Sequence, residues 1–369
     1  MDVVEITQKL IQFDTVTPKG SDCLDFIEQY LNSLGFESTR LPFGDVDNLF
    51  AKKGFDAHHI MYVGHVDVVP PGDDWAYAPF TGVVENNILY GRGAVDMKGS
   101  IGAFLAAISN IQGDQSISIL LTSDEEGPAK DGVAKVIPWL KENNHIPTFA
   151  LVGEPTSVDR VGDTIKNGRR GSISFDIVFY GKQGHVAYPH LAQSAASPLV
   201  MLLEDLISEP LDEGTPDFDP SNLEIVKMNI PNDAYNVIAG VAYASINIRF
   251  NTLHTFKSLE EFVMLKALKV KAQYGGDFVI TPLPSAEPFI AHSTEWTNLV
   301  SKAVKDEIGM EPIRSTSGGT SDARFIHKIC PVIELGLLNK TAHHVNEHVP
   351  TSDLKTLQKI YERILLGYS

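Results

Sequence analysis

Short apolar runs alternate with amphipathic stretches along the first part of the chain. The runs at residues 60–64, 117–122 and 149–153 have the length of buried strands. Between them, residues 99–110 and 133–142 carry apolar side chains at helical spacing. Strands that alternate with helices predict an α/β fold with a mostly parallel sheet and helices on both of its faces.

The same pattern of apolar and polar positions predicts elements along most of the chain. Helices are expected at residues 4–11, 21–34, 99–110, 133–142, 195–209, 259–270, 295–308 and 322–327. Strands are expected at residues 37–41, 48–52, 60–64, 117–122, 149–153, 172–180, 223–229, 242–250, 278–282 and 332–335.

The order of the elements changes after Gly171. From there to residue 285 the prediction is strand, helix, strand, strand, helix, strand, which is typical of a split-βαβ, ferredoxin-like unit. A chain of 369 residues is also too long for one ordinary core. We therefore expect one α/β domain built from residues 1–171 and 286–369, interrupted by an inserted domain at residues 172–285.

Composition narrows the possible partners. The 30 basic residues against 47 acidic ones give a net charge of −17, which argues against binding to nucleic acid or an anionic membrane. A local positive pocket for a small anionic substrate remains possible. Only two cysteines occur, Cys23 and Cys330, so a disulfide framework is not expected. Neither a signal peptide nor a run of about 18 apolar residues is found, and we expect a cytoplasmic protein.

Five candidate metal ligands lie at the ends of strands or the starts of helices. They are His65, Asp96, Glu126, Glu154 and His343. The first four are about thirty residues apart, the length of one strand–helix repeat, so we expect them at the same edge of the sheet. Nitrogen and oxygen ligands without thiolate suit Zn²⁺, Mn²⁺ or Co²⁺, and Zn²⁺ is the common hydrolytic choice. One His, one further ligand and a shared Asp for each ion would form a two-metal site.

Charge balance and neighbouring residues support the same hypothesis. Two divalent cations bring four positive charges, and Asp96, Glu126 and Glu154 with one hydroxide balance them. Asp67 could accept the second ring N–H of His65 and so fix its orientation. Glu125 could act as a general base while the adjacent Glu126 binds metal.

Each of these residues also has a simple structural interpretation when it is considered alone. His65 could be a structural histidine, residues 124–126 a solvated acidic turn, Asp96 a helix N-cap, Glu154 part of a turn, and His185 and His190 surface histidines. Their joint occurrence at strand ends, in one regular series, favours the metal site.

Four motifs resemble those of the dinuclear-zinc aminoacylase, carboxypeptidase and deacetylase family. They are residues 65–70 (HVDVVP), 91–99 (GRGAVDMKG), 123–127 (SDEEG) and 153–156 (GEPT). The resemblance covers essentially the whole chain. It implies a zinc-hydrolase catalytic domain at 1–171 and 286–369, with the inserted unit at 172–285 serving as a dimerisation and lid domain.

Three further segments narrow the resemblance within that family. Residues 168–172, 315–322 and 338–347 are similar to those of enzymes that hydrolyse N-succinyl-LL-2,6-diaminopimelate to succinate and LL-2,6-diaminopimelate, a step toward lysine and cell-wall precursors. The alternatives are a sister activity, such as acetylornithine deacetylase or dipeptidase, and a non-catalytic metal-binding scaffold.

The resemblance also implies roles for the metal-site residues. One Zn²⁺ would be bound by His65 and Glu154, the other by Glu126 and His343, and Asp96 would bridge them; Co²⁺ or Mn²⁺ could substitute. Glu125 would be the general base and acid, Asp67 would support His65, and the peptide bond after Asp96 would be cis. The spacing to Asn346 and Glu347 selects His343 over His344, with His348 as an alternative.

Residues of both domains are implicated in binding the substrate. The resemblance implies a homodimer in which His185 reaches the partner's active site and stabilises the oxyanion. The substrate-binding positions that it implies are Arg169, Tyr188, Asn236, Arg249, Gly319, Thr320 and Asn339. Arginine suits the carboxylates of such a substrate, because its fork binds both oxygens.

Overall fold

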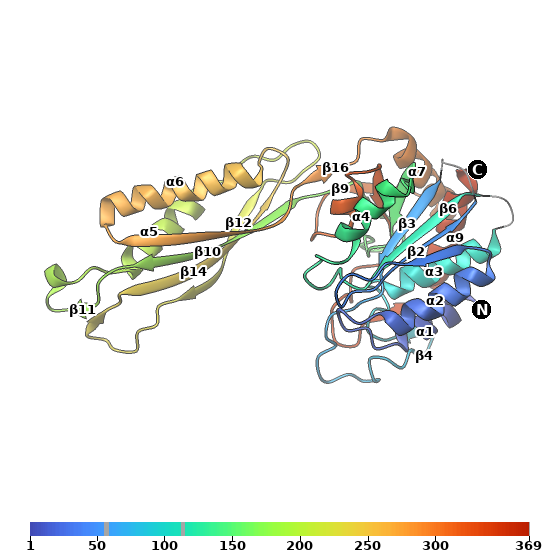
Figure 1. The fold of residues 1–369 in the computed structure, drawn as a ribbon, viewed down its shortest axis with the longest axis horizontal. Coiled ribbons are helices and arrows are strands. Elements are labelled where there is room, and N and C mark those ends of the chain that lie inside the picture. Colours follow the sequence, from blue (N-terminus) through green and yellow to red (C-terminus); the bar gives the residue numbers. More distant parts are fainter. Residues whose placement is uncertain (55–58, 112–114, 369) are drawn as a thin grey trace. The chain divides into compact units, whose positions relative to one another are not determined.

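The computed structural model describes residues 1–54, 59–111 and 115–368. The chain forms two compact units (Figure 1). The first contains Met1–Gly168, Ala291–Ser315 and Ser321–Ser369, and the second contains Arg169–Ile290 and Thr316–Thr320. The second unit therefore extends slightly beyond the expected limits of 172 and 285. It also includes Thr316–Thr320, a short segment that follows the insertion in the chain.

The first unit is built on an eight-stranded sheet. Its order is β1 (Glu37–Arg40), β2 (Asn48–Lys53), β6 (Ile117–Thr122), β3 (Ile60–His65), β7 (Phe149–Val152), β18 (Val332–Glu334), β8 (Thr164–Lys166) and β17 (Ile313–Ser315). The central strands β6, β3, β7 and β18 are parallel, as are β8 and β17. The remaining pairs, β1–β2, β2–β6 and β18–β8, are antiparallel. The predicted α/β class with a mostly parallel central sheet is confirmed.

Helices cover both faces of this sheet. Its central strands are apolar on both sides: Ile60 and Tyr62 of β3 belong to the main hydrophobic core, while Met61 and Val63 are buried on the opposite face. The core also takes side chains from α1 (Val3–Ile11), α2 (Ser21–Ser33), α3 (Lys98–Asn110), α7 (Thr294–Ile308) and α9 (Thr351–Gly367). Outside that core, α4 (Val133–Glu142) packs against β6 and α8 (Ala323–Ile326).

A small three-stranded sheet lies beside the loops of the first unit. Its order is β19 (His348–Pro350), β5 (Ile88–Tyr90) and β4 (Val83–Glu85). Strands β5 and β19 are antiparallel, with Tyr90 opposite His348. This pairing brings the residues that follow β5 next to those that precede β19.

The second unit has the predicted strand–helix–strand–strand–helix–strand order. The elements are β10 (Gly171–Tyr180), α5 (Ala196–Ile207), β12 (Asn222–Asn229), β14 (Val241–Phe250), α6 (Phe256–Tyr274) and β15 (Asp277–Ala286). Their antiparallel sheet has the order β12, β14, β10, β15. Alternate residues of β10, such as Phe175 and Phe179, are buried in a core shared with α5 and α6. Both helices lie beside this sheet in Figure 1.

Short elements complete the fold. In the second unit β11 (Gly184–His185) pairs with β13 (Val237–Ile238), and a 3₁₀ turn, η1, covers Pro189–Leu191. Strand β9 (Gly168–Arg169) pairs with β16 (Phe289–Ile290). None of the helices in the described part of the chain combines the length and the apolar character needed to cross a membrane.

Candidate active site

The parallel strands bring the candidate ligands to one edge of the main sheet. His65 is the last residue of β3, where it lies opposite Thr122 of β6. Glu125 and Glu126 follow β6 by a few residues, and Glu154 follows β7. Because β6, β3 and β7 run in the same direction, their carboxyl ends lie side by side.

Four contacts join the five side chains. Nε2 of His65 lies 3.3 Å from Oδ1 of Asp96 and 3.7 Å from Oε1 of Glu154. Nε2 of His343 lies 3.2 Å from Oδ2 of Asp96 and 2.9 Å from Oε1 of Glu126. The two carboxylate oxygens of Asp96 therefore face two different histidines, which is the arrangement that a carboxylate shared by two metal ions requires.

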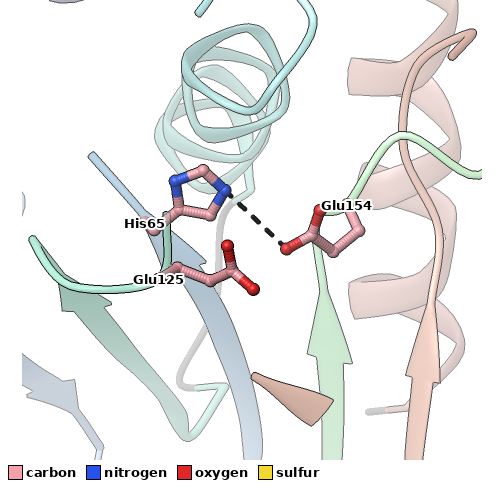
Figure 2. Close-up of side chains that lie close together, drawn as sticks. All are labelled: His65, Glu125 and Glu154. Atoms are coloured by element: carbon pink, nitrogen blue, oxygen red, sulfur yellow. Dashed lines mark ion pairs between the residues drawn. The ribbon is translucent and has the colours of Figure 1, made fainter. Parts of the chain in front are cut away.

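Glu125 belongs to the same cluster. Figure 2 shows its carboxylate beside His65 and Glu154, with the ion pair between those two residues dashed. One potential ligand atom from each of the three lies within 4.8 Å of the others, and the same holds for His65, Asp96 and Glu126. The structure thus places Glu125 next to the ligands.

Two ligands lie in unusual backbone conformations. The peptide bond between Asp96 and Met97 is cis, as the resemblance implied. His343 has φ of +62°, in the left-handed region that non-glycine residues rarely adopt. A non-glycine residue in this region, such as His343, is found most often at functional sites, where the surrounding structure holds it.

Buried negative charge dominates the electrostatics of the cluster. Burial raises the pKa of Glu154 well above its usual value, and Asp96 adds to the rise. Burial disfavours the charged form of His65. The nearby carboxylates of Asp96, Glu154 and Asp67 outweigh this effect and raise the pKa of His65 well above 6.5. Contacts with Asp96 and Glu126 raise the pKa of His343 to about 10. Carboxylates packed this closely favour a bound cation that would compensate their charge.

The ligand chemistry fits a metal of the zinc type. The cluster offers imidazole nitrogens and carboxylate oxygens at separations suited to coordination around an ion. Nε2 of His65 and Oδ1 of Asp96 are buried, and neither makes a hydrogen bond within the described chain despite being 3.3 Å apart. Two such atoms are left available as ligands, which supports the fit.

Asp67 supports the site differently from the way the sequence suggested. Nδ1 of His65 is 2.8 Å from the main-chain oxygen of Asp67, whereas the Asp67 carboxylate is 3.7 Å away, too far for a hydrogen bond. The carboxylate instead accepts the backbone N–H groups of Glu125 (3.3 Å) and Glu126 (3.1 Å). Asp67 therefore orients His65 through its backbone and the Glu125–Glu126 loop through its side chain.

Asp322 has no role assigned from the sequence, yet its negative charge acts on Glu125. Its side chain is 2% exposed, and neither carboxylate oxygen makes a hydrogen bond within the described residues. Burial raises the pKa of Glu125 to about 8, His65 opposes the rise, and Asp322 adds to it. Because an Asp directly before a helix is typical of an N-cap, its sequence context gave no other signal; in α8 it makes no capping hydrogen bond.

The two alternative histidines, His344 and His348, have other partners. His344 is exposed, and its backbone N–H bonds to the carbonyl of Thr341. The ring of His348, on β19, contacts the main-chain oxygen of Asn346 at 2.8 Å and the ring of Tyr90. His343 is the one of the three that contacts Asp96 and Glu126.

The candidate substrate-binding residues fall into separate groups. In the second unit, His185 on β11 is exposed, its ring centroid is 5.6 Å from that of Tyr188, and the backbone N–H of Val186 bonds to the carbonyl of Asn236. Also there, Nη1 of Arg169 donates to the carbonyl of Gly319 at 3.1 Å, one residue before Thr320.

Two further candidates, Arg249 and Asn339, have other neighbours. Arg249 is on β14, opposite Ser172 and Asn222 of the flanking strands. Asn339 is exposed in the first unit, where its backbone N–H bonds to the carbonyl of Ser157. His190, considered above as a surface histidine, is exposed on η1.

The fold and the cluster together define a class of α/β proteins whose candidate metal ligands lie at the carboxyl edge of a mostly parallel sheet. The chain belongs to peptidase family M20/M25/M40, whose profile matches residues 61–367. The family relationship and the enzymatic nature that the motifs predicted are thereby confirmed.

Known relatives cover the full length of the chain. A protein of Ehrlichia canis named succinyl-diaminopimelate desuccinylase is 45% identical, and the match covers 99% of this chain and 98% of the relative. Among solved structures, an M20 metallo-carboxypeptidase of Sulfolobus solfataricus has a TM-score of 0.80 at 17% identity, covering 100% of this chain and 99% of that one. A dinuclear metal-binding M20 peptidase of Bacillus subtilis has a TM-score of 0.75 at 15% identity, covering 99% and 96%. Both structures share the fold of this chain.

Proposed function

We propose that this protein is a succinyl-diaminopimelate desuccinylase, which hydrolyses N-succinyl-LL-2,6-diaminopimelate to succinate and LL-2,6-diaminopimelate. Full-length identity of 45% to a relative of that name supports the substrate. The observation that carries the chemistry is the position of Asp96 between His65 and His343, beside the buried Glu125. The reaction would serve lysine and cell-wall precursor synthesis, and the buried, unpaired Cys23 and Cys330 are compatible with a reducing cytoplasm.

The ligand set would hold two Zn²⁺ ions, with Co²⁺ or Mn²⁺ as possible substitutes. His65 and Glu154 would bind one, Glu126 and His343 the other, and Asp96 both. When bound, the ions would supply Lewis acidity toward the amide carbonyl and lower the pKa of a water molecule toward neutrality. The distances among the five side chains support this division, since each histidine contacts one oxygen of Asp96 and one further carboxylate.

Glu125 would move the proton in this reaction. Its carboxylate lies among the ligands, and burial with nearby carboxylates makes it a stronger base than an exposed glutamate. It would take a proton from the attacking water and return it to the leaving amine. Asp67 would hold the Glu125 backbone in place through the N–H contact described above.

Anionic groups of the substrate require positive or polar partners in a chain whose net charge is −17. We propose the guanidinium groups of Arg169 and Arg249 for the carboxylates, because each can bind two oxygens at once. The remaining proposed substrate contacts are Tyr188, Asn236, Gly319, Thr320 and Asn339.

A three-substrate assay tests the proposed activity. Purified protein with added Zn²⁺ is expected to hydrolyse succinyl-diaminopimelate with a kcat/KM at least about 10²-fold above that for acetylornithine or a dipeptide, because arginine partners of a carboxylate discriminate strongly against an uncharged acyl group. Release of the free amine is measured for each compound. Preference for acetylornithine or the dipeptide would assign a sister activity, and no hydrolysis of any of them would leave a metal-binding scaffold.

We propose further that the protein is a homodimer and that His185 acts in the partner's active site as a donor to the oxyanion. Its exposure on β11, beside Tyr188 and Asn236, supports a role outside its own core. Substituting His185→Ala is expected to lower kcat about 10²–10³-fold, the usual effect of losing one oxyanion donor, with metal content unchanged. Steady-state kinetics and metal analysis measure both; the exposed His190→Ala is the matched control, and unchanged kcat in His185→Ala would contradict the role.

A further inference from the structure

Arg92 and Glu347 form a buried ion pair that the proposed chemistry does not use. Their side chains are 2% and 0% exposed, and Nη1 of Arg92 donates to Oε2 of Glu347 at 2.7 Å. Burying two charges is costly unless further hydrogen bonds satisfy them. The other partners of this pair therefore indicate what it holds together.

Glu347 binds the loop that carries Asp96. Its Oε2 accepts the backbone N–H of Gly93 at 3.0 Å, and its Oε1 accepts those of Val95 at 2.8 Å and Asp96 at 3.1 Å. Three N–H groups of a four-residue stretch thus converge on one carboxylate. Because the last of them belongs to Asp96, the backbone of this ligand is fixed directly.

Arg92 binds the segment that follows His65 and the loop that carries His343. Its Nη2 donates to the carbonyls of Pro71 (3.1 Å) and Pro70 (3.4 Å), which follow His65 in the chain. The same guanidinium donates to the carbonyl of His343 (3.4 Å) through Nη2 and to that of His344 (3.2 Å) through Nη1. One side chain therefore links the segment after the first histidine to the backbone of the second.

Strand pairing explains why these two residues meet. Arg92 follows β5, Glu347 precedes β19, and Tyr90 of β5 lies opposite His348 of β19. The backbone N–H of Gly91 also bonds to the carbonyl of Glu347 at 3.0 Å. The small sheet thus brings the Asp96 loop and the His343 loop together, and the ion pair joins them at its end.

We propose that Arg92 and Glu347 are positioning residues for the metal centre. They hold the Asp96 and His343 loops so that Oδ2 of Asp96 and Nε2 of His343 face each other across a metal position. They contact neither metal nor substrate themselves. This inference rests on the proposed two-metal function.

Substituting Glu347→Gln tests the proposal on the full-length protein. The amide retains an oxygen for Val95 and Asp96 but turns its NH₂ group toward Gly93 and Arg92, where a carboxylate oxygen accepted before. Zn²⁺ affinity is expected to fall about 10–100-fold, the usual effect of losing a partner that orients metal ligands. Zn²⁺ titration of metal-depleted protein in competition with a chromophoric chelator measures the affinity, and the Tm of the metal-free protein is measured in parallel.

A second variant and a control separate positioning from general stability. Arg92→Lys keeps the charge but loses the fork that reaches both the segment after His65 and the His343 loop, so it should weaken Zn²⁺ binding to a similar extent. Glu307→Gln breaks another ion pair of the first unit, in which Nε of Arg363 donates to Glu307 at 2.8 Å. That control should bind Zn²⁺ as the wild type does.

The outcomes distinguish this proposal from the function on which it rests. Wild-type Zn²⁺ affinity in Glu347→Gln or in Arg92→Lys would overturn it, even if the Tm of the metal-free variant falls. If Glu347→Gln does not fold, Arg92→Lys decides alone. A wild-type protein that binds no Zn²⁺ would instead reject the two-metal function, and the positioning role with it.

Discussion

Substituting Glu125→Gln is expected to lower kcat about 10²–10⁴-fold, the range that a positioned general base contributes, while two metal ions remain bound. The amide is nearly isosteric with the carboxylate but cannot accept the proton of the attacking water. Its backbone contact with the Asp67 carboxylate is unaffected, so the fold and the ligand positions should be retained. Steady-state kinetics with metal analysis by mass spectrometry measures both quantities.

The neighbouring glutamate provides the contrast. Glu126→Gln removes a proposed ligand that lies 2.9 Å from His343, so it should lose metal as well as activity. Nearly full activity in Glu125→Gln would remove this residue from the mechanism. Loss of metal from Glu125→Gln would make it a ligand, as its position within 4.8 Å of His65 and Glu154 also allows.

Substituting Asp96→Ala is expected to have the broadest effect of any single change in the site. It removes the carboxylate that contacts both His65 and His343, and with it the only proposed ligand that both ions share. Metal content should fall from two ions per chain toward zero, and activity should fall at least about 10³-fold, because the ions supply several kcal/mol of transition-state stabilisation.

Thermal unfolding is an independent test of metal binding by Asp96→Ala. Zn²⁺ should raise the Tm of the wild-type protein, since a ligand at 100 times its Kd stabilises by about 2.7 kcal/mol, and it should leave the Tm of Asp96→Ala unchanged. The matched control is Asp163→Ala in the same unit, whose carboxylate accepts the backbone N–H groups of Val158, Asp159 and Arg160. This control should lower the Tm without changing metal content. Two bound ions in Asp96→Ala would contradict the bridging role.

The edge of the sheet that carries the ligands was predictable because strand and helix alternate at intervals of about thirty residues. Strands β3, β6 and β7 are buried on both faces, and each has a His, Asp or Glu at its carboxyl end or within a few residues after it. Periodicity could therefore place His65, Glu126 and Glu154 together before any coordinates were considered. It could not assign the hydrogen bonds of Asp67, because the carbonyl and the carboxylate of one residue compete for the same ring proton, and loop geometry decides between them.

Residues that act through loop backbone were beyond sequence reasoning. Arg92 and Glu347 are separated by more than 250 positions, and only the pairing of β5 with β19 brings them together. These strands have three residues each, too few for a periodic signal. By contrast, α9 carries Leu354, Leu357, Ile360 and Ile364 at helical spacing, so its pattern was available although no element was predicted there.

The limits of two elements in the second unit differ for physical reasons. Helix α6 begins at Phe256 rather than at residue 259, because Thr255 and Ser258 form a capping box before the first apolar residue of the pattern. Strand β15 continues to Ala286 through Pro282 and Pro284, residues that favoured an end at 282. It is an edge strand of its sheet, where proline is tolerated.

We propose that Asp96 bridges two metal ions. One would be bound by His65 and Glu154, and the other by His343 and Glu126. The most direct test is anomalous diffraction from Zn²⁺-soaked crystals, recorded above and below the zinc absorption edge. We predict two peaks per chain, one on the Oδ1 side of Asp96 and one on the Oδ2 side, about 3.5–4 Å apart. A single peak, or peaks that lie away from the Asp96 carboxylate, would contradict this account.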